Sequence, residues 1–495
     1  MSLALLVLLT LACLPDNWQS LTWDLLPFDP IRSALLTWAG VAFLVAAARW
    51  LATWTCRRLH RQPDLGEAVV RRYRTWRFWH FQGLLAFYWA ALFVLGWGGA
   101  VQSLGPVDKE GVSQLFPGAE FLILAPFLVP LILSWACYHD VDRARHGSAE
   151  LEGLPPFWGR WAHVGFQIRN QLALVLVPIT LLILEKGLRR FFGDSPYGWI
   201  LQGVLMGLLA AAFVALPWAL RWVLRLQPMP EGPVRDRLLA ASRRLKFRCS
   251  NILLWHTKGN MANAMVAGLI PQIRYVVMTD RLVADLTPDE LEAVFGHEVG
   301  HVKHRHMLYY LGFLVVSLTV VAGFWDLLAP YLPDFALLQA NQDLAALPLF
   351  ALLAAYIFVV FGFLSRRCER QADIFGCRAV SCARGDCTGH EPDVLLLPEG
   401  KGLCPTGIRT FIGALEKVAE LNGISRNKPG WLQSWQHSTI ARRVDFLQEV
   451  LAEPAREVRF QRAVGRVKLA LLLGLGGLLL LLGSMPGGWQ RLLPF

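Results

Sequence analysis

Residues 286–301 read LTPDELEAVFGHEVGH and place two histidines four residues apart, with a glutamate directly after the first. On a helix of 3.6 residues per turn, His297 and His301 lie on one face, where both can bind the same Zn²⁺. Glu298 lies to the side of that face, within reach of a water on the metal. The spacing therefore predicts a site that splits an amide with a zinc-activated water.

The residues before the two histidines predict where their helix begins. Thr287 is a suitable N-cap, Pro288 suits the first helical position, and Glu290 can close a capping box onto Thr287. An apolar face follows at Leu291, Val294 and Phe295. This context favours a metal site over the plain alternative, a pair of core histidines satisfied by hydrogen bonds.

Two histidines leave a catalytic zinc site incomplete, since such a site takes three protein ligands and a water. His304 lies about 10 Å beyond His297 along the helix axis, which is too far for both to share one ion with His301. Residues 369–373, ERQAD, follow an apolar span directly. Glu369 is the best candidate for the third ligand, and Asp373, one helical turn later, could hold the second ring nitrogen of a ligating histidine.

In several separated pieces, the sequence resembles the membrane-embedded zinc metallopeptidases of the HtpX and CAAX prenyl endopeptidase family. The pieces are, in chain order, Asn263-Ala264, residues 286–301 with His306, residues 369–373, and His437 followed by Arg442 and Arg443. They run from about Pro230 to Leu447, which is less than half of the chain. Their order is more specific than any later piece alone.

The resemblance implies one catalytic Zn²⁺ with Glu369 as the third ligand and Glu298 as the general base. It also implies that Asn263 and Ala264 bind substrate, because the family's matching strand, here Met261 to Gly268, is an edge strand along which an extended peptide lies. The plain alternative for Asn263 is a turn residue.

A downstream histidine and arginine hold the substrate carbonyl in that family, and the resemblance assigns these roles to His437 and Arg442. Ser438 stands where the family usually has proline, which leaves the choice between Arg442 and Arg443 open. The plain alternative for His437 is a solvated histidine at the start of a helix.

The composition of the 495 residues predicts an integral membrane protein. Hydrophobic residues make up 55% and charged residues 17%, the mean hydropathy is +0.40, and the apolar residues come in blocks. Ser2–Leu14 is interpreted as a short additional span, because it lacks the basic segment and the cleavage site of a signal peptide. The main predicted spans are Ser33–Ala48, Phe81–Val101, Phe121–Tyr138, Gln171–Leu184, Tyr197–Leu220, Met307–Trp325, Leu344–Leu364 and Leu469–Met485.

The expected fold is an α-helical polytopic membrane protein, with about eight to nine transmembrane helices and a discontinuous cytoplasmic α+β zincin domain. Within that domain, the sequence predicts a helix around Val234–Leu245 and strands around Ile252–Trp255, Ala262–Leu269 and Arg274–Met278. The expected parts are an N-terminal transmembrane region (1–225), a first part of the peptidase domain (226–306), a transmembrane helix pair (307–364), a second part with a cysteine-rich insertion (365–466) and a C-terminal transmembrane helix (467–495).

The arginines predict the orientation. They are dense in Arg57–Arg77 and Arg221–Arg248, whereas loops between the spans carry acidic residues such as Asp108 and Asp334. Because basic loops stay on the cytoplasmic side, both metal-binding segments should face the cytoplasm, and the expected location is the bacterial inner membrane. The net charge of +11 then reflects topology, and no nucleic-acid partner is expected.

The nine cysteines are unevenly distributed. Four fall in a short insertion after Asp373, with His390 among them: Cys377, Cys382, Cys387 and Cys404. A cytoplasmic loop disfavours disulfides, so the cluster suggests a structural metal, a redox-responsive pair or reduced thiols. Because the spacing contains no paired C-x-x-C, reduced thiols are the expected state.

These patterns predict a membrane-integrated zinc metalloendopeptidase that hydrolyses peptide bonds in protein or peptide substrates at the border of the lipid bilayer. The sequence makes no prediction of oligomeric state. A zinc-dependent signalling sensor is one alternative, although the short outward loops disfavour it. A catalytically silent membrane scaffold is another, and the intact Glu298 disfavours it.

Overall fold

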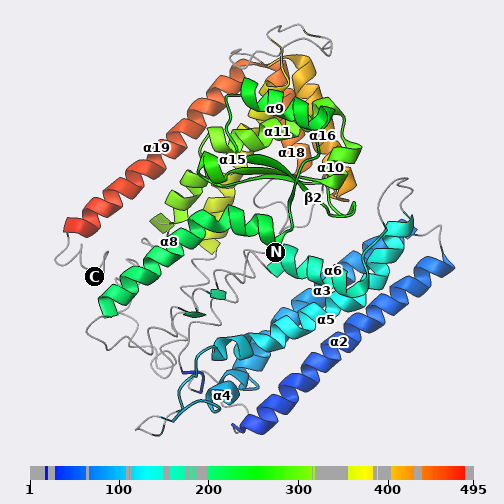
Figure 1. Ribbon diagram of the computed structural model, residues 1–495, viewed down its shortest axis with the longest axis vertical. Coiled ribbons are helices and arrows are strands. Elements are labelled where there is room, and N and C mark those ends of the chain that lie inside the picture. Colours follow the sequence, from blue (N-terminus) through cyan, green and yellow to red (C-terminus); the bar gives the residue numbers. More distant parts are fainter. Residues whose placement is uncertain are drawn as a thin grey trace. The chain divides into compact units, whose positions relative to one another are not determined.

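The structure is a computed structural model that describes residues 17–19, 28–62, 66–107, 111, 113–148, 156–172, 179–180, 183–184, 198–314, 316–317, 355–382, 387, 403–427 and 438–484 (Figure 1). The described residues form two compact units, one from residues up to Leu209 and the other from residues after it. The predicted span Ser2–Leu14 and most of the predicted span Gln171–Leu184 lie outside the described residues.

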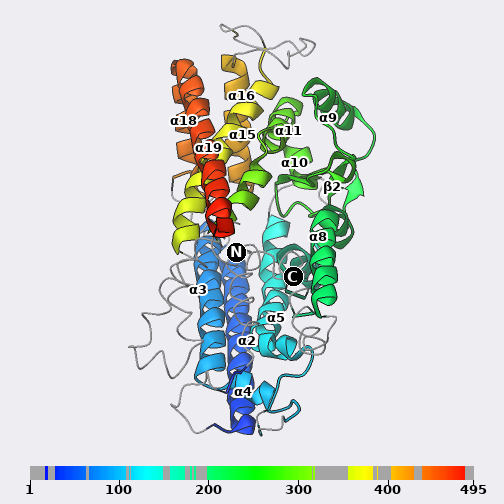
Figure 2. The same ribbon diagram turned by 90° about the vertical axis from the view of Figure 1, so that its left-hand side faces the viewer.

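Long helices build the first unit. Helices α2, α3 and α5 lie alongside one another (Figure 2), and their facing side chains, among them Leu84, Leu92 and Phe127, form a buried core. Asp29 caps α2, because its carboxylate accepts from the backbone N–H groups of Ile31 and Arg32. The elements are α2 (Pro30–Arg61), α3 (Gly66–Phe93), α4 (Trp97–Gln102), α5 (Ala119–Ser148), α6 (Arg160–Gln167) and a π-helical turn, η2 (Ile168–Leu172).

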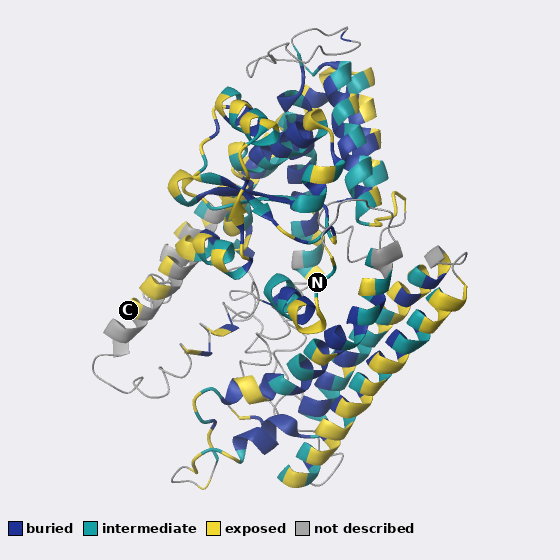
Figure 3. Cartoon of the chain, turned by 45° about the vertical axis from the view of Figure 1, so that its right-hand side comes forward, coloured by how far each residue is buried: buried dark blue, intermediate teal, exposed yellow. Residues whose placement is uncertain are grey.

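Two helices in the described part of the chain, Pro30–Arg61 and Ala119–Ala144, are long and apolar enough to cross a membrane. They contain the predicted spans Ser33–Ala48 and Phe121–Tyr138. Exposed residues follow α2 along its length (Figure 3), and those that are large and apolar include Ile31, Leu35, Phe43 and Trp50. A helix that is apolar on its outward side as well as in its contacts is typical of a membrane span.

The predicted span Phe81–Val101 is wrong as one continuous helix. α3 ends at Phe93, and α4 starts anew at Trp97. Between them, Gly96 adopts φ 74°, a left-handed conformation that glycine tolerates and that interrupts a helix. α3 instead extends back to Gly66 and includes part of the arginine-rich segment.

The remaining predicted spans are helical wherever they are described. Tyr197–Leu220 corresponds to α8 (Gly198–Val223), and Leu469–Met485 falls in α19 (Ala455–Ser484). Of Leu344–Leu364, the described end is helical and includes the π-helical turn η5 (Ile357–Phe361).

A four-stranded sheet forms the centre of the second unit, with strand order β1-β2-β4-β3. The central strands β2 and β4 are parallel, with Leu253 opposite Val277, and the outer strands are antiparallel to their neighbours. Among the described strands β3 therefore lies at an edge, as the family resemblance implies. The strands are β1 (Gln227–Pro228), β2 (Asn251–Trp255), β3 (Ala264–Ala267) and β4 (Tyr275–Thr279).

Helix α11 covers the sheet, because Leu291, Phe295 and Val299 share one buried cluster with Ile252 and Val276. The predicted capping box is confirmed, since Thr287 and Glu290 exchange both side-chain-to-backbone hydrogen bonds. The helices of this unit include α9 (Pro233–Arg244), α10 (Asp280–Asp285), α11 (Pro288–Lys303), α15 (Gly362–Ala379), α16 (Pro405–Leu421) and α18 (Ile440–Ala452).

Helices α11 and α15 approach each other almost backbone to backbone. A Cβ atom on Gly296 would lie 2.3 Å from the Cβ atom of Ala379, and one on Gly300 would lie 2.9 Å from the Cβ atom of Phe375. The two glycines lie on the same helix face, four residues apart. Without side chains there, the two helices can pack closely enough for functional groups from both to meet.

A buried carboxylate forms ion pairs beside this contact. Glu292 is 3% exposed and pairs with Arg237 and Arg244 of α9, while Arg244 also donates to the carbonyl oxygen of Ala379, 2.7 Å away. Because a buried carboxylate is costly unless it is paired, this network connects α9, α11 and α15 in one arrangement.

We predict that Gly296→Ala lowers the free energy of unfolding by about 1–3 kcal/mol, because its methyl group overlaps Ala379 and pushes α11 from α15. The matched control is Gly413→Ala on α16, where a new Cβ atom meets no atom closer than 3.6 Å and helix propensity improves by about 1 kcal/mol. Thermal unfolding of both variants checks the prediction. Equal stability of the two would contradict the close packing.

Candidate functional site

Two histidines of α11 and one glutamate of α15 converge between these helices. Nε2 of His297 lies 3.3 Å from Nε2 of His301. The Glu369 carboxylate lies 3.9 Å from the first of these nitrogens and 3.6 Å from the second. Glu369 is 4% exposed, so the structure brings the three expected ligands together in a largely buried place.

The spacing of these donor atoms fits a zinc ion. Around a tetrahedral ion with ligand bonds of about 2.0–2.1 Å, neighbouring donor atoms are separated by about 3.3 Å. The two nitrogens are 3.3 Å apart, and each lies close to a different oxygen of Glu369, His297 3.9 Å from Oε2 and His301 3.6 Å from Oε1. These separations are close to the expected value. Two imidazoles and one carboxylate are also a common donor set of catalytic zinc, which keeps a fourth position for water.

Asp373 orients His297 from behind. Nδ1 of His297 lies 3.0 Å from the Asp373 carboxylate, which itself accepts a 2.9 Å hydrogen bond from Nε of Arg443. Burial alone would raise the pKa of Asp373, but Arg443 and His297 hold it below its ordinary value. An ionised Asp373 favours the proton on Nδ1, so Nε2 of His297 presents its lone pair to the metal position.

A chain of polar groups orients His301 by a different route. Nδ1 of His301 lies 3.0 Å from Nδ1 of His306, and Nε2 of His306 lies 3.1 Å from Oε1 of Gln371. The same Oε1 accepts a 2.8 Å hydrogen bond from Nζ of Lys468 on α19. Nε2 of Gln371 in turn donates to Oε1 of Gln461, 2.6 Å away.

Lys468 determines the direction of every bond in this chain. An ammonium group only donates, so the Gln371 atom beside it is the oxygen. Nε2 of His306 must therefore donate to that oxygen, and Nδ1 of His306 must accept from Nδ1 of His301. The lone pair of His301 is then on Nε2, the nitrogen that faces Glu369.

Burial and the neighbouring His301 lower the pKa of His306 to about 2. The ring is therefore neutral at physiological pH, as the chain of bonds requires. The sequence offers little to predict these partners: Gln371 lies within the ERQAD stretch, but Lys468 is only a charge at the start of an apolar span.

His304 takes no part in the metal-ligand group. It is the C-cap residue of α11, and its ring stacks on His306 at 5.7 Å between centroids. Burial and the positive charge of Lys468 lower its pKa to about 4. Its position agrees with the expectation that His304 lies too far along the helix to share the ion.

Glu298 follows His297 on α11, about 100° around the helix axis from it, and is half-buried. The pKa of Arg443 is raised above its ordinary value despite burial, and Glu298 is one of three carboxylates that raise it, with Asp373 and Glu369. The expected base therefore belongs to the same electrostatic cluster as the expected ligands.

The arginine near the ligands is Arg443, and not the expected Arg442. Arg443 is 8% exposed, and Nη1 of its guanidinium lies 3.8 Å from Glu369, whereas Arg442 is exposed. The physical reason is the phase of α18, which starts after the N-cap Thr439. On that helix, Arg443 shares a face with the buried Leu447 and Val450.

The expected histidine, His437, lies outside the described residues. Its neighbour Ser438 has φ 66°, a value that the ring of proline excludes. At the position where the family usually has proline, the backbone of this protein therefore has a conformation that proline cannot adopt.

The expected substrate strand, β3, lies beside α11, the helix that carries His297 and His301. β3 contacts α11, Ala264 is its first residue, and Asn263 directly precedes it. Backbone N–H of Asn263 donates to Oγ1 of Thr279 at 2.9 Å. A side chain that the sequence did not suggest, Asn422 at the end of α16, donates to and accepts from the backbone of Ala262 and so holds the entry to this strand.

Comparison with known proteins gives several partial matches. Residues 234–393 match the family model "Peptidase family M48". The uncharacterized metalloprotease YhfN of Bacillus subtilis is 36% identical over 130 residues, 24% of this chain and 30% of that protein. A protease HtpX homolog of Archaeoglobus fulgidus is 34% identical over 24% of this chain and 35% of that protein.

A CAAX prenyl protease 1 homolog of Dictyostelium discoideum is 31% identical over 29% of this chain and 37% of that protein. The chain thus spans about a third of the length of these curated relatives. The crystal structure of S. mikatae Ste24p covers 85% of this chain and 100% of its own, with 16% identity and a TM-score of 0.53, so the two share a fold. Together these matches support an HtpX and CAAX prenyl protease family member, with residues 234–393 as the segment that matches peptidase family M48.

Proposed function

We propose that this protein is a zinc metalloendopeptidase that cleaves proteins or peptides at the border of a membrane. The observation that supports this most is the group formed by His297, His301 and Glu369, in which each histidine has a separate partner that directs its Nε2 lone pair to one point. When bound there, Zn²⁺ supplies Lewis acidity that polarises a carbonyl and lowers the pKa of water.

Glu298 is the proposed general base. Its carboxylate takes a proton from the attacking water and then donates that proton to the departing amine nitrogen, so that one group serves both halves of the reaction. Glu298 lies on the same helix as the histidines, and the rigidity of α11 fixes its distance from them. Such an arrangement costs little reorganisation during the reaction.

Arg443 is proposed as a positioning residue. Its guanidinium binds Asp373 and approaches Glu369. Its positive charge therefore interacts with these two carboxylates, and the guanidinium is not free to contact a substrate. The proposal assigns the contact with the substrate carbonyl to His437, following the family resemblance.

The edge strand β3 is the proposed substrate platform. Among the described strands, β3 pairs only with β4, and it lies beside α11. An extended peptide that pairs with the free edge of β3 through main-chain hydrogen bonds would run along α11. Asn263 and Ala264, at the start of this strand, are the proposed substrate-binding residues.

The membrane border is proposed as the place of cleavage, because α11 and the Glu369 segment both adjoin predicted spans. Helical residues follow directly from His306, and Glu369 lies five residues after Leu364, where a predicted span ends. We further propose that this side faces the cytoplasm of a bacterial inner membrane, on the distribution of arginines.

The role of Glu298 predicts that Glu298→Gln retains zinc but loses about 10²–10⁴-fold in the rate of peptide cleavage, because the amide cannot accept the proton. Zinc analysis and a peptide-cleavage assay on the same preparation check this. Glu449→Gln is the matched control, since Glu449 is a half-exposed carboxylate that pairs with Arg456 on the surface. Cleavage by Glu298→Gln at a rate close to that of the control would exclude the proposed base.

The chain of bonds behind His301 predicts that Gln371→Leu lowers zinc affinity by about 10–100-fold, because His306 and Lys468 lose their shared acceptor. Gln371→Glu offers an acceptor at the same place and should retain most of the affinity. Competition with a zinc chelator measures both, beside Gln448→Leu on the exposed side of α18. If the leucine and glutamate variants bind zinc equally well, the hydrogen bonds through His306 and Gln371 do not orient His301.

The proposed orientation predicts which side of the membrane a probe cysteine reaches. In intact cells, a membrane-impermeant thiol reagent should miss a cysteine at Asp289 and should modify one at Asp108, each compared with the unsubstituted chain. Strong labelling at Asp289 from outside would reverse the orientation.

A further inference from the structure

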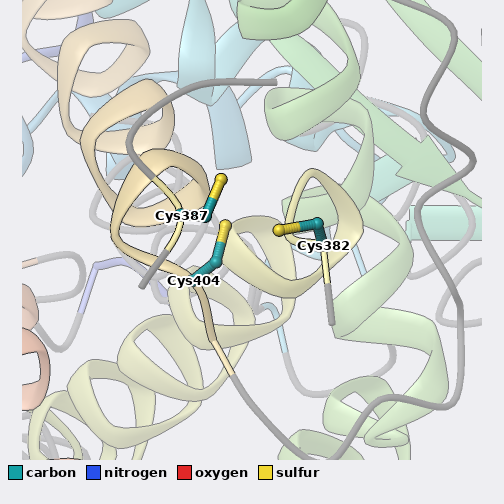
Figure 4. A group of neighbouring side chains, drawn as sticks. All are labelled: Cys382, Cys387 and Cys404. Carbon is teal, nitrogen blue, oxygen red and sulfur yellow. The ribbon is translucent and has the colours of Figure 1, made fainter. Parts of the chain in front are cut away.

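Three cysteines outside the catalytic group converge where α15 ends and α16 begins. Their thiol sulfurs lie within 4.8 Å of one another, and in Figure 4 the thiol of Cys382 points toward those of Cys387 and Cys404. Cys404 is fully buried and Cys387 is 7% exposed. All three are thiols, with no disulfide among them.

The three cysteines come from separate points of the chain, so their meeting is a property of the fold. Cys382 follows α15, Cys387 lies in the insertion, and Cys404 is the N-cap residue of α16. The two helix ends touch at Gly407, where a Cβ atom would lie 2.3 Å from Oγ of Ser381. Oγ of Ser381 also accepts from the backbone N–H of Cys404 at 3.2 Å.

Two of the three sulfurs lie beside the first turn of α16. The backbone N–H of Gly407 donates to Sγ of Cys404 at 3.2 Å, and Oγ1 of Thr406 lies 3.3 Å from Sγ of Cys387. The hydroxyl of Thr406 donates its one proton to the carbonyl oxygen of Cys387, 3.1 Å away, so its Oγ1 accepts from the thiol of Cys387. Gly407 and Thr406 both belong to the first turn of α16, a 17-residue helix whose N-terminus carries partial positive charge. The N–H group of Gly407 is therefore in place to donate to the sulfur of Cys404 when a metal ion replaces its proton.

We propose that Cys382, Cys387 and Cys404 supply three of the four ligands of a second metal ion, a structural Zn²⁺. Sulfur ligands of a tetrahedral zinc, with bonds of about 2.3 Å, are separated by about 3.8 Å, and the observed cluster needs only a small contraction to reach that spacing. Binding releases the thiol protons to solvent, so the product is a zinc thiolate with no change of oxidation state.

A structural role follows from the position of the ion. It would close the insertion between residues 382 and 404 onto the adjoining ends of α15 and α16. α15 also carries Glu369 and Asp373, so the ion would stabilise the helix that completes the catalytic group without touching it. The inference does not depend on the proposed peptidase activity.

Metal analysis of the full-length chain, purified with a thiol reductant and without chelator, tests this. The unsubstituted protein should contain two zinc ions per chain, and Cys387→Ser and Cys404→Ser should contain one. Cys249→Ser is the control, a half-buried thiol outside the cluster, and should keep two.

Cobalt substitution separates the two sites. Co²⁺ bound by thiolates shows near-ultraviolet charge-transfer absorption, which should persist in His301→Ala, where the catalytic group is broken, and disappear in Cys387→Ser. One zinc per unsubstituted chain with no thiolate absorption from cobalt would overturn the proposal. A disulfide between two of the three cysteines in the freshly purified protein, with no second metal, would overturn it as well.

Discussion

The close contact of α11 and α15 is the constraint on which the site depends. Neither helix holds a complete set of metal ligands, and the missing donor must reach across their interface. Gly296 and Gly300 of α11 remove the side chains that would keep the helices apart. The paired Glu292 then ties the neighbouring α9 to the same interface. Packing of this kind positions functional groups more accurately than a loop can.

The two histidines proposed as metal ligands are oriented by chemically different partners. Behind His297 stand a carboxylate and a guanidinium, both ionised and both buried. Behind His301 stand neutral His306 and the amide of Gln371, with the single charge of Lys468 at the far end. The charged partner increases the basicity of its histidine. The neutral partners His306 and Gln371 fix the tautomer of His301. They do so without a second carboxylate close to Glu369, where like charges would repel.

Local patterns predicted much of the second unit. The capping box at Thr287, the spacing of His297 and His301, and the ERQAD segment are signals within a few residues, and their helices form as expected. The edge position of β3 followed from the family resemblance and is borne out by the sheet order. The break in the predicted span Phe81–Val101 was not predicted. The whole run is apolar, and its composition does not show that Gly96 adopts a left-handed conformation.

Other parts of the site were predictable only in part. The face of α18 distinguishes Arg443 from Arg442, because Arg442 shares its side with the exposed Asp445 and Glu449; that periodicity was available in the sequence. The contact of Gln371 with Lys468 joins residues 97 positions apart, and no local pattern encodes such a pair.

The central claim is that one zinc ion is held by His297, His301 and Glu369. Anomalous diffraction at the zinc absorption edge, on crystals of the zinc-loaded chain, tests it most directly. The account predicts an anomalous peak about 2 Å from Nε2 of both histidines and from a carboxylate oxygen of Glu369. A peak that instead lies beside His304 or His306, with Glu369 turned away, would contradict it.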